Sequence, residues 1–251
     1  MAGHPVLGLT GLVFLAGSIL LLFFIILSGV KGTTPLDKTY FLQADTSGIT
    51  GARDLSQWTY FHICGAGNTG CSKASPAMPF GHAWANNADN IPSGLGGKYA
   101  GNTTAEFYFY MWRFGWVMYL MSLFFEVMAF FAGFLACCGR LGAAISGLVA
   151  FTALFFYSVA VSLMTATFVK ARNAFHADGR SASLGKYAFG FSWGAWAALL
   201  IATVLFFLGT RRTDSVARNS GRRWGRRRQS TARSSNSYDV GSSRRVKDDY
   251  S

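Results

Sequence analysis

Four long apolar stretches constrain the fold of this chain more than any other feature. They cover residues 6–27, 115–138, 141–169 and 187–210, and Glu126 is the one charged residue within them. A hydrocarbon core about 30 Å thick is crossed by roughly 20 apolar residues in a helix. All five prolines lie outside the stretches, as expected for helices whose backbone groups must pair with each other in lipid. The sequence therefore predicts four transmembrane helices.

The predicted fold class is an all-α membrane protein: a four-transmembrane-helix bundle with a large extracellular first loop, which contains a small β-element, and a disordered basic C-terminal tail. The expected segments are a short cytoplasmic N-terminus (1–5), transmembrane helix 1 (6–28), extracellular loop 1 (29–112), helix 2 (113–138), a cytoplasmic turn (139–141), helix 3 (142–169), extracellular loop 2 (170–186), helix 4 (187–210) and the tail (211–251). The first stretch is interpreted as a retained helix, because a signal peptide has a shorter apolar run, a basic start and a small-residue cleavage site.

The distribution of positive charge predicts the orientation. The chain carries a net charge of +12, and residues 211–251 alone hold 12 Lys or Arg against 4 Asp or Glu. Basic residues next to spans stay on the cytoplasmic side. The four basic residues of segment 170–186 weakly oppose this assignment, but the tail outweighs them. We expect both termini in the cytoplasm, in a multi-pass protein.

The four cysteines fall into two pairs with different expected environments. Cys64 and Cys71 lie in the first loop, where an oxidising exterior favours a disulfide. A metal site is the alternative, but His62 alone would not complete its ligands. Cys137 and Cys138 lie at the cytoplasmic edge of the second span and are candidate palmitoylation sites, or two reduced apolar side chains.

Asn102 begins the single N-x-[ST] sequon of the chain and is a candidate N-glycosylation site in the first loop. The second span starts only a few residues later, so the nearby membrane works against modification by the transferase.

Glu126 is expected about 17 Å into the second span, near the bilayer centre. A carboxylate there costs several kcal/mol unless it is paired or protonated. Ser158, Ser162 and Thr165 of the third span are candidate hydrogen-bond donors to it. Both a structural, protonated Glu126 and a functional one remain open, with the structural role favoured.

No motif predicts catalysis, a metal or a cofactor. Residues 190–194 match the G-x-S-x-G pattern of serine hydrolases, but they lie within an expected helix and no His follows them. The same residues read as a G-x-x-x-G packing motif, because small residues let two membrane helices approach closely.

The tail holds a cluster of arginines flanking one tryptophan. These residues are Arg222, Arg223, Trp224, Arg226, Arg227 and Arg228. Basic residues near an anionic leaflet bind it, so we expect a lipid-binding tail, with fixation of topology as the alternative. Ser230 follows the arginines as a candidate phosphosite that would weaken this binding. No nucleic-acid partner is expected, because the membrane is the nearer polyanion.

The first loop carries residues that resemble a known family. Trp58 is followed by Cys64 and Cys71, and then by the segment Pro-Ala-Met-Pro-Phe at residues 76–80. This order, behind the first of four spans, resembles the fungal SUR/PalI family of tetraspan plasma-membrane proteins and, more distantly, claudins. The resemblance implies that Trp58, Cys64 and Cys71 anchor the loop. Residues 57–63, rich in aromatic and β-branched types, fit the small sheet of claudin-like loops. The remainder of the loop is expected to be mostly irregular.

The resemblance also implies a function. It points to an eisosome-type compartment of the fungal cell cortex, with roles in membrane organisation, cell-wall integrity and endocytosis. The claudin Gly-Leu-Trp run is absent, which argues against a paracellular barrier role. The tail is shorter than in the pH-sensing PalI branch, which favours the eisosome branch. A non-enzymatic membrane organiser is therefore the leading hypothesis, with lipids, other proteins of the compartment and a second copy of the chain as candidate partners. A transporter or channel subunit and a membrane sensor or receptor are the alternatives, marked by a polar path through the bundle and by a ligand pocket in the first loop.

Overall fold

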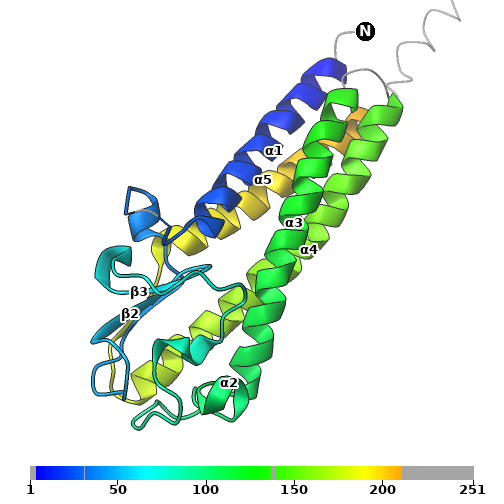
Figure 1. Ribbon diagram of the computed structural model, residues 1–251. Coiled ribbons are helices and arrows are strands. Elements are labelled where there is room, and N and C mark those ends of the chain that lie inside the picture. Colours follow the sequence, from blue (N-terminus) through cyan, green and yellow to red (C-terminus); the bar gives the residue numbers. More distant parts are fainter. Residues whose placement is uncertain (1–3, 31, 137–139, 211–251) are drawn as a thin grey trace, which may run out of the picture. The chain divides into compact units, whose positions relative to one another are not determined.

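The computed structural model describes residues 4–30, 32–136 and 140–210 of the chain. Its main elements are four long helices: α1 (His4–Ile26), α3 (Glu106–Ala136), α4 (Arg140–Ala177) and α5 (Lys186–Thr210) (Figure 1). All four are long and apolar enough to cross a membrane. The four predicted transmembrane helices, and with them the fold class of the described residues, are confirmed.

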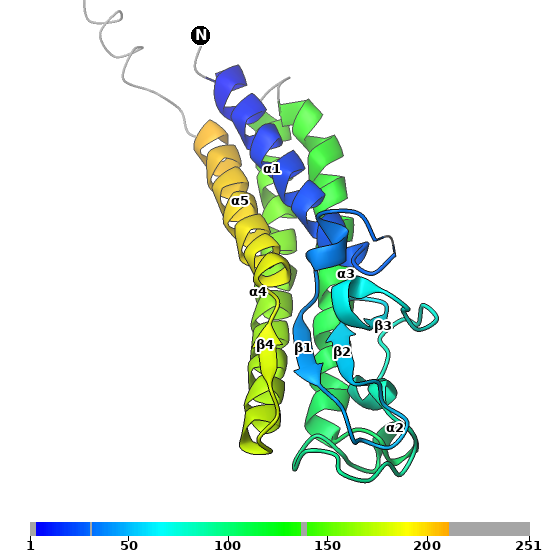
Figure 2. The ribbon, with the colours of Figure 1, turned by 90° about the vertical axis from the view of Figure 1, so that its left-hand side faces the viewer.

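The helices form an antiparallel bundle. α3 and α4 pack against each other over most of their length, while α1 lies against α5 and α5 also contacts α4 (Figures 1 and 2). Large apolar side chains remain exposed along the outside of every helix. Because lipid tails surround a membrane bundle, these exposed side chains need no protein partner.

Two helices are longer than the predicted spans. α3 begins at Glu106 rather than at residue 113, and α4 continues to Ala177 rather than ending at 169. Both continue past the ends of α1 and α5 and run alongside the loops (Figure 1). Hydropathy marks the part of a helix that crosses lipid, whereas packing against the loops extends the helix further. Where the membrane begins along α3 and α4 stays a prediction.

A four-stranded antiparallel sheet lies against the extended parts of α3 and α4 (Figure 2). Its strands are β1 (Leu42–Asp45), β2 (Leu55–Trp58), β3 (Ile63–Cys64) and β4 (Ala182–Leu184), in the order β3-β2-β1-β4. The β-element predicted at 57–63 is present, but as two strands, β2 and β3, joined by a turn. β1 and β4 were not predicted; β1 is a short exception in a loop expected to be mostly irregular.

β4 comes from the second loop, so the sheet joins both loops into one layer. Gly185, which follows β4, donates its N–H to the Phe41 carbonyl at 3.0 Å. A Cβ at Gly185 would collide with the Tyr40 carbonyl oxygen, so only glycine allows this approach of the two chains. Short helical turns complete the layer: η1 (Leu36–Lys38), η2 (Ala66–Asn68), η3 (Phe80–Ala83) and α2 (Tyr99–Asn102).

Candidate functional site

Trp58 is the centre of the loop layer. Its side chain is fully buried and stacks on Phe80 with ring centroids 4.8 Å apart. Its indole Nε1–H donates to the Phe80 carbonyl at 3.0 Å, and its ring also meets Phe175 of α4. Phe80 ends the segment 76–80, so two parts of the loop pattern noted in the sequence meet in space. Trp58 thus binds β2 to η3 and to a membrane helix at one point.

Cys64 and Cys71 form a disulfide, which closes a short loop beside β3. Asn68 lies inside that loop and is buried. Its side-chain Nδ2 donates to the carbonyls of Leu36 and Thr39, at 2.7 and 3.0 Å, and its backbone N–H donates to the Gln57 side chain at 2.8 Å. The disulfide loop is therefore tied both to β2 and to the chain that leaves α1. Sequence reasoning missed Asn68, because a single Asn in a polar loop carries no pattern.

Tyr60 connects the loop layer to the bundle. Its hydroxyl donates to the Trp116 carbonyl of α3 at 2.7 Å, and its backbone N–H donates to the Ser28 hydroxyl at 3.2 Å. The Tyr60 and Trp116 rings stack with centroids 5.4 Å apart. Burial raises the pKa of the Tyr60 hydroxyl well above its usual value, with the Tyr119 hydroxyl adding to the effect, so Tyr60 remains a donor.

Arg180 connects the two loops. Its guanidinium pairs with Asp178 at 2.8 Å and donates to the backbone carbonyls of Ser47 and Asn90 in the first loop. Close by, hydrogen bonds from the Ser47 hydroxyl and backbone N–H hold the pKa of the Asp45 carboxyl below its usual value, and Arg180 contributes a smaller attraction. A planar fork with five donors suits Arg for bridging several carbonyls.

Glu126 is fully buried in the bundle and is contacted by two serines. Ser18 of α1 donates to its Oε2 at 2.8 Å, and Ser122 of α3 donates to its Oε1 at 3.1 Å. Each serine hydroxyl also lies within bonding distance of a carbonyl, Ala195 of α5 for Ser18 and Ala153 of α4 for Ser122, at 3.0 and 3.1 Å. The cluster therefore has contacts to all four helices.

A count of protons favours a neutral Glu126. There are four short oxygen–oxygen contacts, and each serine hydroxyl supplies one proton. A neutral carboxyl group supplies a third, whereas an ionised one would have to share both serine protons with the two carbonyls. None of the three expected donors is a partner. Ser158 and Thr165 each donate to a carbonyl of their own helix, those of Leu154 and Val161, and Ser162 is exposed. Ser18 could not be predicted as a partner, because it lies on the first helix, 108 residues before Glu126 in the sequence.

Tyrosines extend the buried polar cluster toward the loops. Tyr119 donates to the Ser192 hydroxyl of α5 at 3.0 Å, and its ring packs edge-on against Tyr157 of α4 and against Tyr60. The Tyr157 hydroxyl is buried and, among the described residues, has no hydrogen-bond partner. Aromatic contacts thus run without a break from the loop layer to the neighbourhood of Glu126. Ser192 belongs to the G-x-S-x-G match, and its burial inside a helix agrees with a packing role.

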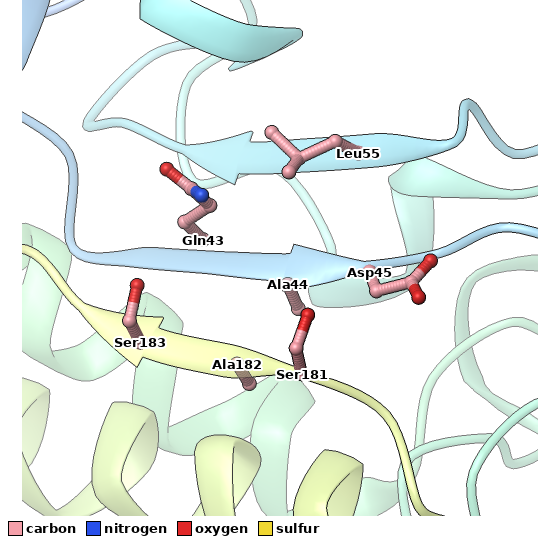
Figure 3. A pocket seen from close by; sticks show the side chains of 7 residues that line it. All are labelled: Gln43, Ala44, Asp45, Leu55, Ser181, Ala182 and Ser183. Atoms are coloured by element: carbon pink, nitrogen blue, oxygen red, sulfur yellow. The ribbon is translucent and has the colours of Figure 1, made fainter.

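A groove of about 270 Å³ crosses the outer face of the sheet between β1 and β4 (Figure 3). It is lined by Gln43, Ala44, Asp45, Leu55, Ser181, Ala182 and Ser183. Two of its polar groups already have protein partners, because Gln57 donates to the Gln43 side chain at 2.7 Å and Ser47 donates to Asp45. Across residues 4–30, 32–136 and 140–210, no three His, Cys, Asp or Glu side chains gather to hold a metal ion.

The remaining predicted sites divide into two groups. Asn102 is exposed and donates to the Asn87 side chain at 2.9 Å, whereas Thr104 of the same sequon is fully buried. Its glycosylation stays a prediction. The other predicted sites lie outside the described residues; they are Cys137, Cys138, Arg222, Arg223, Trp224, Arg226, Arg227, Arg228 and Ser230.

Comparison with known proteins gives the family. Residues 7–205 match the SUR7/PalI family. This range contains both the loop layer around Trp58 and the buried polar cluster around Glu126. The chain belongs to the SUR7/PalI family. The family resemblance inferred from the sequence is thereby confirmed.

Three curated relatives of this SUR7/PalI protein come from yeasts. The chain is 36% identical over 197 residues to the SUR7 family protein FMP45 of Saccharomyces cerevisiae, covering 76% of this chain and 62% of that protein. It is 37% identical over 202 residues to Protein SUR7 of Candida albicans, covering 79% and 72%. It is 33% identical over 201 residues to the S. cerevisiae uncharacterized plasma membrane protein YNL194C, covering 77% and 64%. The matches thus span less than two thirds of the length of two of these relatives. Together with the four candidate spans, they support a multi-pass protein of the fungal plasma membrane.

Proposed function

We propose that this SUR7/PalI protein is a non-enzymatic organiser of an eisosome-type compartment of the fungal plasma membrane. In this proposal it contributes to membrane organisation, cell-wall integrity and endocytosis. Its partners are membrane lipids, other proteins of the compartment and further copies of the chain. The loops face the cell exterior, both termini lie in the cytoplasm, and the basic tail binds anionic lipid.

The observation that carries the proposal is that the loop residues which resemble the family serve a structural role. Trp58 and Cys64 are fully buried, and with Cys71 they hold the loop layer together instead of lining the groove on the sheet. Tyr60 and Arg180 fix the same layer to the bundle and to the second loop. Residues arranged in this way maintain a fixed surface beside a membrane, which is what a scaffold needs for lateral contacts.

The buried polar cluster supports a scaffold better than a transporter. Glu126 and its two serines bridge all four helices, which holds the helices in one arrangement. Most polar side chains in the described bundle interior bond to a neighbouring helix or to their own backbone. The Tyr157 hydroxyl has no hydrogen-bond partner among the described residues. This observation favours a conducting role, because polar groups along a conduction path exchange partners.

The proposal can be tested by imaging the full chain, fluorescently labelled, in a yeast lacking its own SUR7-family proteins. We expect immobile cortical patches with slow recovery after photobleaching. A Trp58→Ala variant should lose the patches, while Trp193→Ala, on the exposed face of α5, should keep them. A uniform, freely diffusing surface signal, or retention in internal membranes with normal folding, would contradict the organiser role. An ion flux abolished by Glu126→Gln would favour the transporter.

A further inference from the structure

Arg113 is a cation of α3 that no described residue neutralises. Its guanidinium carbon lies 3.8 Å above the centroid of the Phe109 ring, one turn earlier on the same helix. Its Nε is buried without a hydrogen-bond partner, and the ion pair in the described part of the chain joins Arg180 to Asp178 instead. A half-buried guanidinium with unused donors is a candidate binding group for an anion.

The helix register places Arg113 at the depth of lipid headgroups. Ser18 of α1 contacts Glu126 of α3, and the two helices run antiparallel. Eight residues from this contact toward the loops, α1 ends at Ile26 and α3 is at Met118. Arg113 lies about 7.5 Å beyond that level, at 1.5 Å per residue. The first predicted span ends at residue 28, close to this level, so the sequence prediction places the end of the apolar layer here and Arg113, the first residue of the second predicted span, at its edge.

The outer face of α3 next to Arg113 is apolar and exposed. Tyr110, Phe114 and Val117 are 44%, 56% and 42% exposed, and they lie three residues before, one after and four after Arg113. The exposed row continues toward the other end of α3 through Met121, Phe124, Met128 and Phe131. Side chains three and four residues apart share one face of a helix. Arg113 therefore stands at the headgroup end of a surface on which an acyl chain can lie.

The charges around Arg113 favour an anion. Glu106, the acidic residue nearest to Arg113 along α3, is two turns away, about 10.5 Å along the axis. On the neighbouring helix, Lys170 lies 3.8 Å above the Phe107 ring and adds a second positive charge near this end of α3. Phe109, beneath the guanidinium, is packed against Tyr99 with centroids 5.0 Å apart. The ring is thus held in place and fixes one face of the Arg113 fork.

We propose that Arg113 binds the phosphate of an anionic phospholipid in the leaflet on the loop side of the bundle, with the lipid's acyl chain along Phe114, Val117 and Met121. A guanidinium offers two parallel N–H donors to phosphate, which a lysine cannot reproduce. Cation–π contact with Phe109 holds the guanidinium in place against α3. This site lies in the described helices and is independent of the tail arginines. It assigns the protein a lipid preference in the leaflet opposite its termini.

The test uses the full chain in detergent micelles, titrated with phosphatidylserine or phosphatidylcholine of identical acyl chains and followed by native mass spectrometry. Both lipids carry a phosphate, but the choline cation neutralises it in phosphatidylcholine, so wild type should bind the net-negative phosphatidylserine more tightly. Arg113→Gln should lower phosphatidylserine affinity about fivefold, the effect of one basic residue at an anionic lipid surface. Arg113→Lys should recover only part of the loss, because the fork is missing.

Arg172→Gln is the matched control, because it removes the same charge from α4 at a side chain bonded to its neighbour Asn173. It should leave the affinity unchanged. The tail contributes equally in every variant and cancels from the comparison. Inorganic phosphate at the same concentration should not displace the lipid, since the acyl chain adds to binding. Equal affinity of wild type and Arg113→Gln, equal loss in Arg172→Gln, or displacement by phosphate would overturn the proposal.

Discussion

The Ser18 hydroxyl of α1 lies 2.8 Å from the Glu126 carboxyl of α3, in the middle of the bundle. This contact joins two residues that are 108 positions apart in the sequence. It also gives Glu126, the one ionisable residue within the four apolar stretches, a partner that is itself bonded to a third helix through the Ala195 carbonyl. In lipid, where apolar side chains gain nothing from leaving water, such contacts are a main source of helix association.

Glu126→Gln should keep the stability of the bundle, since an amide can donate to one serine and accept from the other. Glu126→Leu should lower it by about 1 to 2 kcal/mol, the scale of an intramembrane hydrogen bond. Thermal unfolding of the purified protein in detergent measures both. Ser18→Ala should fall between the two variants. A Leu variant as stable as wild type would mean that the cluster does not hold the helices together.

Trp58→Ala should destabilise the loop layer by about 3 to 5 kcal/mol, because removal of this fully buried ring leaves a cavity in its place. Trp58→Phe should cost less, since it keeps the stack on Phe80 and loses only the bond to the Phe80 carbonyl. Trp193→Ala, at a 44% exposed position, should cost about 1 kcal/mol or less. Limited proteolysis of the loops and thermal unfolding report the differences. Similar losses at positions 58 and 193 would argue against the anchoring role.

Joint replacement of Cys64 and Cys71 by Ser should cost about 2 to 3 kcal/mol, the entropic value for a loop this short. The loop should then be cleaved faster by proteases, although Asn68 still holds it through the Leu36 and Thr39 carbonyls. Mass spectrometry of non-reduced peptides from cell-surface protein checks the bond itself. Free thiols at both positions in that sample would contradict it.

Arg180→Ala should loosen the second loop from the first. It removes the bonds to the Ser47 and Asn90 carbonyls together with the pair to Asp178, and we expect a loss of about 1 to 2 kcal/mol. Hydrogen exchange should rise first in β1 and β4, which pair next to Ser47 and Ser181. Arg172→Ala, whose bonds go to the adjacent Asn173, is the control and should leave exchange in the sheet unchanged.

Asp45 gives the loop layer a dependence on pH. Hydrogen bonds from Ser47 lower the pKa of its carboxyl in the folded protein. The stabilisation is therefore complete above the unfolded value of about 3.9 and is lost as the pH falls through the lower folded pKa. Asp45→Asn should flatten the fall in melting temperature between about pH 4 and more acidic solution. Ser47→Ala should flatten it partly; a slope unchanged by both variants would exclude this cause.

The sequence predicted the elements whose signals are local. Twenty apolar residues in a row suffice to predict a membrane helix, and two cysteines in an external loop suggest a bond. Strand β4 escaped prediction, because Ala182–Leu184 is short and becomes a strand only when it pairs with β1. Likewise, the helices α3 and α4 extend past the predicted spans because the loop layer packs against them.

The number of long helices, the place of Glu126 within a span and the pairing of Cys64 with Cys71 could be predicted, since each follows from polarity or spacing along the chain. The groups that meet these residues depend on how the helices and strands pack. Ser18 rather than Ser158 reaches Glu126, Phe80 receives the Trp58 indole, and Tyr60 bonds the Trp116 carbonyl. The physical reason is that hydrogen bonds and ring contacts act over a few ångströms, whereas the partners are brought that close only by the packing of whole helices and strands.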